Sequence, residues 1–289
     1  MLIGAHVSVS SGYIKALDYA QSVGCECAQV FAKSPRQWRG GSIDPEAARE
    51  FAAERAARGF GPLYTHTSYL INLAAIDPEM REKSIAALAD ELVRGSVLGA
   101  AGVVSHIGAD AAGDPAAASK RIGSAIIEAS ERAGGDGCHT RLLLENTAGA
   151  GSTVGSTFSE IALCIRATDL PSERLGVCLD TCHAFAYGYR VDTAQGWAEL
   201  VAEIGETIGV ERLGLIHAND CKFGAGEKKD RHEWIGDGFI GLAGFEAMVC
   251  VPELAGVSVV TEMPGEVPEK DAVNVLRLIA LREACAESQ

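Results

Sequence analysis

Short apolar runs alternate along the chain with longer amphipathic segments, and this alternation restricts the fold more than any other feature. The runs are rich in β-branched residues and predict eight strands, at Leu2–Val7, Ala28–Ala32, Leu63–His66, Gly102–His106, Arg141–Glu145, Gly176–Asp180, Leu213–His217 and Ser258–Glu262. Because a parallel strand pair needs a long crossover connection, strands that alternate with helices predict a parallel sheet.

The amphipathic segments predict eight helices. They span Ser10–Val23, Pro45–Arg58, Pro78–Leu98, Pro115–Ala133, Ser156–Ala167, Thr193–Ile208, Ala243–Val249 and Pro268–Cys285. Three begin with Asp-Pro, where Asp can cap the helix and Pro can take its first position. No linker-like stretch interrupts the units, so we predict an α/β fold with one domain over residues 1–289, a single (β/α)8 TIM barrel. A doubly wound open sheet is the alternative, but it does not need eight evenly spaced units.

Composition and charge restrict the class of protein. With 47% hydrophobic and 22% charged residues, the chain can bury a large core. The first ten residues lack a signal peptide, which predicts a cytoplasmic protein. Nine cysteines, an odd number, make a disulfide framework improbable, so we predict buried thiols, as at Cys164, Cys178 and Cys250. The net charge of −14 argues against nucleic-acid binding through a generally basic surface.

Six consecutive predicted strands end on residues that can bind a metal. These residues are His66, His106, Glu145, Asp180, His217 and Glu262. In a barrel the carboxyl ends of the strands converge on one face, which carries the active site of such enzymes. Two local motifs add ligands: His183 follows Asp180 by three residues, and Asp230 and His232 share one side of an extended backbone.

The ligand set indicates the kind of metal. A single strand-end His or Asp is more often a structural residue, but six in register would repel one another, and a bound cation relieves that repulsion. Imidazoles and carboxylates without thiolates suit Zn²⁺, Mn²⁺ or Fe²⁺. One ion needs about four ligands, so nine ligands imply two or three ions.

Several motifs resemble the endonuclease IV family of apurinic/apyrimidinic endonucleases. They are IGAHVS at 3–8, RQW at 36–38, H-x-SYLINL at 66–73, LENTAG at 144–149, GVCLDTCHAFAYGY at 176–189, IHAND at 216–220 and DRHEWIGDGFIG at 230–241. Together they span nearly the whole predicted barrel. LENTAG, CLDTCHAFA and DRH-x-x-IG-x-G are highly specific.

The resemblance implies three zinc ions, with Mn²⁺ or Fe²⁺ as alternatives at some sites. His66, His106 and Glu145 would bind the first ion. Glu145, the implied catalytic residue, would bridge to a second ion that Asp180, His217 and Glu262 complete. His183, Asp230 and His232 would bind the third. Zinc makes hydroxide available at neutral pH, and we expect a hydroxide to attack the scissile phosphorus.

The resemblance also implies a substrate and partners. The expected substrate is double-stranded DNA with an abasic site, cut 5′ to the lesion to leave a 3′-hydroxyl and a 5′-deoxyribose phosphate, or DNA with a blocked 3′ end. Arg36, Tyr69 and Leu70 would enter the duplex and stabilise the extruded nucleotide. We expect a monomer, with no membrane and no obligate protein partner.

The sequence departs from the family pattern beside three ligands. Thr67 stands where Asp commonly follows the His, Ile107 replaces Pro, and Met263 replaces Thr. No ligand is lost, but such neighbours influence metal affinity and substrate preference. His6 is predicted either to line the site or to be structural, and His139 to lie at the opposite face.

The acidic total is compatible with DNA as a substrate. The charges of three Zn²⁺ exceed those of the four ligand carboxylates, so the loaded site attracts phosphate. Basic residues lie on the same side of the predicted barrel, namely Lys33, Arg36, Lys222, Lys228, Lys229 and Arg231. Two other functions stay open: a metal-dependent sugar isomerase or epimerase, and a non-catalytic DNA- or metal-binding module. The motif of Asp230 and His232 favours phosphodiester chemistry over the first.

Overall fold

The computed structural model describes residues 1–138, 140–264 and 269–288. Eight parallel strands close into a barrel in the order β1-β10-β7-β6-β5-β4-β3-β2. They are β1 Ile3–His6, β2 Cys27–Phe31, β3 Leu63–His66, β4 Gly102–His106, β5 Arg141–Glu145, β6 Leu175–Asp180, β7 Leu213–His217 and β10 Ser258–Thr261. The predicted (β/α)8 barrel is therefore confirmed, and Glu262 lies one residue beyond its strand.

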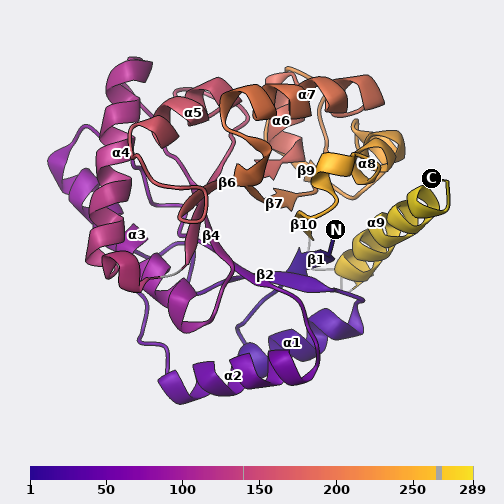
Figure 1. Cartoon of the computed structure of the whole chain (residues 1–289), viewed down its shortest axis with the longest axis horizontal. Coiled ribbons are helices and arrows are strands. Elements are labelled where there is room, and N and C mark those ends of the chain that lie inside the picture. Colours follow the sequence, from indigo (N-terminus) through magenta and orange to yellow (C-terminus); the bar gives the residue numbers. More distant parts are fainter. Residues whose placement is uncertain (139, 265–268, 289) are drawn as a thin grey trace.

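Helices surround the barrel (Figure 1). They are α1 Tyr13–Ser22, α2 Pro45–Ala57, α3 Pro78–Val97, α4 Pro115–Arg132, α5 Phe158–Arg166, α7 Ala194–Thr207, α8 Gly241–Val249 and α9 Glu269–Ser288. Asp44, Asp77 and Asp114 accept hydrogen bonds from the first-turn N–H groups of α2, α3 and α4, as their Asp-Pro pairs predict. Pro268, the predicted start of the last helix, and His139 lie outside the described residues. Among the helices described, none is long and apolar enough to cross a membrane.

Several short elements were not predicted. Helix α6, Thr181–Tyr187, follows β6 directly, and β8, Asp220–Cys221, pairs antiparallel with β9, His232–Glu233. The described residues also include three 3-10 helices, η1 Gly135–Gly137, η2 Val210–Arg212 and η3 Pro252–Leu254. Each is too short to show a hydrophobic period in the sequence.

The interior of the barrel holds a small apolar cluster, separate from the larger core between strands and helices. Its members, here called the inner apolar layer, are Cys27, Tyr64, Val104, Leu143, Cys178, Leu215 and Val260. One comes from each of seven strands. On β1 the chain has Gly4, where a Cβ would lie 1.8 Å from the carbonyl oxygen of Cys27, so only glycine fits. The layer fills the barrel below the carboxyl ends of its strands.

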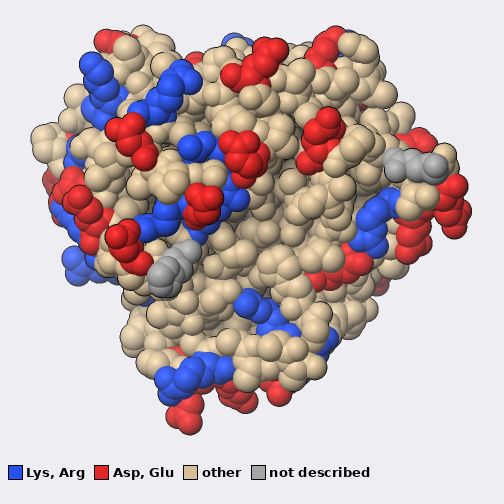
Figure 2. Space-filling model, in the orientation of Figure 1, with Lys and Arg blue, Asp and Glu red and all other residues tan. Residues whose placement is uncertain are grey.

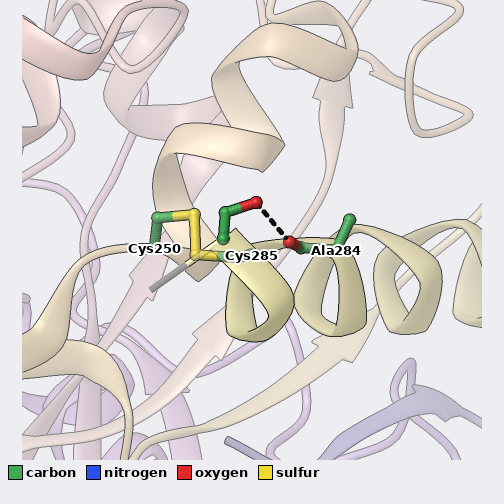
Figure 3. Close-up of a disulfide and its surroundings, with 4 residues drawn as sticks. Cys250, Ala284 and Cys285 are labelled. Carbon is green, nitrogen blue, oxygen red and sulfur yellow. Dashed lines mark hydrogen bonds between the residues drawn. A yellow bond between two sulfur atoms is a disulfide. The ribbon is translucent and has the colours of Figure 1, made fainter.

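The cysteines correct one prediction. Seven are buried free thiols, as predicted, at Cys25, Cys27, Cys138, Cys164, Cys178, Cys182 and Cys221. The predicted thiol at Cys250 is wrong, because Cys250 forms a disulfide with Cys285 of α9 (Figure 3). An odd number of cysteines does not exclude a single pair. The packing of α9 beside the end of α8 brings the two Cα atoms within 5.8 Å across a sequence separation of 35 residues.

Candidate metal centre

The inward-facing side chains become polar one pleat above the inner apolar layer. Strand side chains alternate between faces, so the residue two positions after each apolar one again points inward. These residues, here called the polar ring, are His6, Gln29, His66, His106, Glu145, Asp180, His217 and Glu262. Six are the predicted strand-end ligands, and His6 and Gln29 occupy the two remaining strands.

The first group of ligands lies on β3, β4 and β5. Nε2 of His66 and Nε2 of His106 lie 3.2 and 3.1 Å from Oε2 of Glu145. Each of the three residues offers a ligand atom within 4.8 Å of the others. His66 and Glu145 are buried, whereas the His106 side chain is 37% exposed, so this group opens to solvent on the His106 side.

The second group shares Glu145 with the first. The other oxygen of Glu145, Oε1, lies 3.1 Å from Nδ1 of His217, which is also 3.2 Å from Oε2 of Glu262. Asp180 places Oδ2 3.9 Å from the same nitrogen. All four residues fall within one possible metal site. Glu145 therefore turns one oxygen to each group, which is the arrangement of a bridging carboxylate.

The third group comes from elements outside the barrel. His183 lies on α6, where the Asp180 carboxylate caps the helix and accepts the N–H of His183 at 2.8 Å. Nε2 of His183 lies 3.2 Å from Asp230, and Nε2 of His232, on β9, lies 3.4 Å from the same carboxylate. The three residues form one possible site. The structure thus brings all nine predicted ligands together as the three predicted sets.

Hydrogen bonds orient the ligand histidines. Nδ1 of His66, His183 and His232 lies 2.9, 2.9 and 3.0 Å from a main-chain carbonyl oxygen. The acceptors are the carbonyls of Thr67, Asn146 and Glu262. A carbonyl only accepts, so each Nδ1 carries a proton, and in the neutral ring Nε2 keeps the lone pair that a metal needs.

Two asparagines that were not predicted fix the carboxylates. The Asn219 amide donates to Oδ2 of Asp180 at 2.6 Å, and its oxygen accepts the N–H of Glu262 at 2.8 Å. The Asn146 oxygen accepts the N–H of Asp180 at 2.7 Å. Both asparagines are fully buried. Asn146 directly follows β5, and Asn219 lies two residues beyond β7. Their positions in the motifs LENTAG and IHAND are the sequence signal by which they could have been identified as site residues.

Opposite charges dominate the electrostatics of the site. Burial alone raises the pKa of Glu145, but the charges of His106 and His217 outweigh it and hold that pKa well below its ordinary value. Burial lowers the pKa of His232, but its hydrogen bond to Asp230 and the charge of Asp180 outweigh burial and raise that pKa to about 9. Protonated imidazoles thus balance the buried carboxylates, and a divalent cation can replace those protons.

The structure brings a thiol near the same ligands. Cys182, with Asp180 and His232, forms a fourth possible group that shares two residues with the others. A hydrogen bond to Cys221, together with burial, raises the pKa of the Cys182 thiol.

The three predicted DNA-contacting residues lie on two linked loops above the first group. The Tyr69 ring is 55% exposed and lies 5.7 Å, between ring centroids, from both His66 and His106. Its N–H donates to the carbonyl of Pro35 at 3.0 Å, beside the exposed Arg36. Leu70 is half-buried next to Tyr69.

Two of the six basic residues on the predicted binding side are engaged in close ion pairs, and one of these is buried. The Lys33 side chain is only 2% exposed and pairs with Asp90 at 2.8 Å, so Lys33 is structural. Lys229 pairs with Glu227 at 3.0 Å. On the face shown in Figure 2, basic and acidic side chains are interspersed.

His6 contacts Glu262 at 3.1 Å and therefore lines the site.

Known proteins resemble the chain over nearly its full length. A family model described as a xylose isomerase-like TIM barrel matches residues 17–280. A probable endonuclease 4 of Methanoculleus marisnigri is 39% identical over 98% of this chain and 100% of that protein. One of Chloroflexus aurantiacus is 40% identical over 96% of this chain and 97% of that protein.

Solved structures agree with this similarity. The crystal structure of endonuclease IV from Thermus thermophilus matches with a TM-score of 0.86 and 35% identity, covering 100% of both chains. A D-tagatose 3-epimerase-like protein matches with a TM-score of 0.73 but only 18% identity, covering 100% of this chain and 99% of that one. The second likeness shows the fold alone.

Proposed function

The chain belongs to the endonuclease IV family, and on this premise we propose that it hydrolyses the DNA phosphodiester 5′ to an abasic site. It is a DNA-cleaving hydrolase of DNA repair, and the proposed products are a 3′-hydroxyl and a 5′-deoxyribose phosphate. The observation that carries the proposal is the assembly of nine ligands into three groups, of which the first and second share Glu145. A sugar epimerase needs one or two ions and a free acid–base pair, so it has no use for the third group.

The centre binds metal, and we propose that it holds three zinc ions, with Mn²⁺ or Fe²⁺ as alternatives at some sites. Support comes from the donor atoms: imidazole nitrogens with fixed lone pairs and ionised carboxylates, which suit these ions. When bound, such ions lower the pKa of water and neutralise charge on a phosphate.

The residues of the chain then have separate roles. Glu145, the proposed catalytic residue, holds the first two groups at a fixed separation by using both oxygens. Asp180 is locked by Asn146 and Asn219, and it connects the second group to His183 on α6. These hydrogen bonds keep the ligands in place before substrate arrives, so little reorganisation is needed in the reaction.

Arg36, Tyr69 and Leu70 are proposed to contact the DNA. The exposed Tyr69 ring can stack on a base or sugar exposed by the lesion, and Arg36 can pair with a phosphate. The position of Tyr69 over His66 and His106 places this contact directly beside the first ligand group. An abasic nucleotide lacks a base to unstack, so its extrusion is inexpensive.

The remaining expectations follow the same premise. We propose that residues 1–289 form one domain that acts as a monomer without an obligate protein partner. Because the relatives are DNA-repair endonucleases, we propose a cytoplasmic location. The same centre is proposed to remove blocking groups from 3′ ends, since these are also phosphate esters.

A labelled duplex with one tetrahydrofuran abasic analogue tests the proposal. We expect a single cut directly 5′ to the analogue, with a 3′ end that a polymerase extends, no cut in the undamaged duplex, and loss of activity after chelation. Tetrahydrofuran excludes strand breakage by β-elimination. A metal-loaded protein that leaves this duplex intact contradicts the proposal, and turnover of a ketose by the same preparation supports the epimerase instead.

A further inference from the structure

Gln29 is the one member of the polar ring that is neither a predicted ligand nor a titratable group. It lies on β2, is fully buried, and points inward two residues after Cys27 of the inner apolar layer. Both ends of its amide are engaged. Oε1 lies 2.9 Å from Nε2 of His217, and Nε2 lies 2.8 Å from Oε1 of Glu262 and 2.9 Å from Nδ1 of His6.

The contact with His217 determines which nitrogen of that ring can bind a metal. His217 differs from the other four ligand histidines, because its Nδ1 lies nearest the carboxylates of its own group. Nδ1 can be a ligand only if the ring proton is on Nε2, and an amide oxygen beside Nε2 favours this tautomer because it accepts a hydrogen bond from the Nε2–H group. In His66, His183 and His232 a main-chain carbonyl accepts a hydrogen bond from Nδ1 and so fixes the tautomer, whereas in His217 a side chain accepts from Nε2.

The contact with Glu262 orients the second ligand. The amide N–H of Gln29 holds Oε1 of Glu262, which leaves Oε2 facing Nδ1 of His217 at 3.2 Å. One amide therefore sets the proton position of a histidine and the rotation of a carboxylate in the same ligand group. Neither Glu145 nor Asp180 has a hydrogen bond to Gln29 among the interactions described.

We propose that Gln29 is a positioning residue for the second metal, the ion bound by Glu145, Asp180, His217 and Glu262. The inference rests on the proposed metal centre. Residues that orient metal ligands typically contribute about 10-fold to 100-fold to metal affinity or activity. Because Gln29 contacts ligands of this group alone, the loss should be confined to one of the three ions.

Gln29→Met tests the proposal, since methionine has a similar length and no strong hydrogen-bonding group. The matched control is Gln195→Met, at an exposed amide on α7 that bonds Glu199. Zinc transfer to a chromophoric chelator is measured for the purified full chain, together with the melting temperature of the metal-free protein and incision of the abasic duplex. We expect one ion to bind about 10-fold to 100-fold more weakly in Gln29→Met, and the other two to bind as in the wild type. kcat should fall with little change in KM, the metal-free melting temperature should stay near that of the wild type, and Gln195→Met should match the wild type throughout.

Two results overturn the inference. One is a Gln29→Met protein that releases zinc as the wild type does. The other is equal weakening of all three ions with a lower metal-free melting temperature, which means general loosening of the barrel. If Gln29→Met does not fold, Gln29→Asn keeps an amide too short to reach both partners, and it should show the same single-ion loss or the inference fails. A wild-type protein that binds no zinc contradicts the proposed centre itself, whereas three ions bound with wild-type affinity in Gln29→Met contradict only the role of Gln29.

Discussion

The inner apolar layer and the polar ring use the same strands, one pleat apart, and have opposite effects on the protein. On β5, Leu143 faces the barrel axis in the lower layer, and Glu145 faces it in the ring above. The lower layer stabilises the barrel, because burial contributes about 25 cal/mol for each Å² of apolar surface. The ring buries charges, which costs free energy unless they are paired. Stability and chemistry are thus separated by two residues along each strand.

The largest expected effect is loss of function without loss of fold. Glu145→Gln removes the charge that the first two ligand groups share, so incision of the abasic duplex should fall by about 10²-fold to 10³-fold, the scale seen when a preorganised electrostatic partner is lost. The metal-free protein should still fold, because the amide fits the carboxylate site, but it should unfold at a lower denaturant concentration because His106 and His217 lose the charge that balances them. Near-normal cleavage by this variant contradicts the role assigned to Glu145.

The complementary change lies two residues earlier on the same strand. Leu143→Ala leaves a cavity at a side chain that is 1% exposed, and it should lower the free energy of unfolding by about 2–5 kcal/mol. Urea denaturation of the metal-free protein measures the loss. At temperatures where the variant is folded, its zinc content should match the wild type. An unchanged unfolding midpoint contradicts the separation of the two layers.

A smaller effect is expected at the rim. Tyr69→Ala removes an exposed ring and should weaken binding of the abasic duplex by about 1–3 kcal/mol, while zinc content and the unfolding free energy stay as in the wild type. Binding is measured by fluorescence anisotropy with Glu145→Gln as the background, so that the duplex is not cut. Tyr69→Phe, which keeps the ring, serves as the control. Equal affinity in all three proteins argues against contact between Tyr69 and DNA.

The smallest effect is expected at a carboxylate far from the ring. Glu26 pairs with Arg282 of α9 at 3.0 Å and accepts the N–H of Ile3. Burial raises the pKa of Glu26, but Arg282 and the Ile3 N–H outweigh it and lower that pKa below its ordinary value. The stabilisation is therefore present above the pKa of unfolded Glu26, and it is lost as the pH falls through the lower pKa of the folded state.

Glu26→Gln isolates this contribution. The substitution should cost up to about 1 kcal/mol of unfolding free energy at pH 7, because the pair is partly exposed, and less at pH 3. Urea denaturation at the two pH values provides the measurement. A cost that is the same at both pH values indicates that the charge of Glu26 does not stabilise the fold.

Most of the ring could be predicted because its members are typical metal ligands at the ends of apolar runs. His66, His106, Glu145 and His217 mark the ends of β3, β4, β5 and β7 in the structure as in the sequence. Gln29 was missed because glutamine is not a typical metal ligand. The alternation of inward-facing residues along β2 could have found it.

Other features depend on contacts distant in sequence. The Asp220 carboxylate accepts the N–H groups of Gly236, Gly238 and Ile240, and so shapes the loop beyond β9 without a local signal. The pairing of Cys250 with Cys285 likewise depends on the packing of α9 beside α8, which no spacing reveals. Lys33 was one of the basic residues predicted on the binding side of the barrel, but the fold places it against Asp90 and Glu91.

Anomalous diffraction at the zinc absorption edge, on crystals of the zinc-loaded protein, tests the central claim most directly. The account predicts three peaks: one among His66, His106 and Glu145, a second beside Glu145 and His217, and a third among His183, Asp230 and His232. Each should lie about 2.0–2.2 Å from its nitrogen and oxygen ligands. A ring without anomalous density, or zinc bound at other residues, contradicts the account.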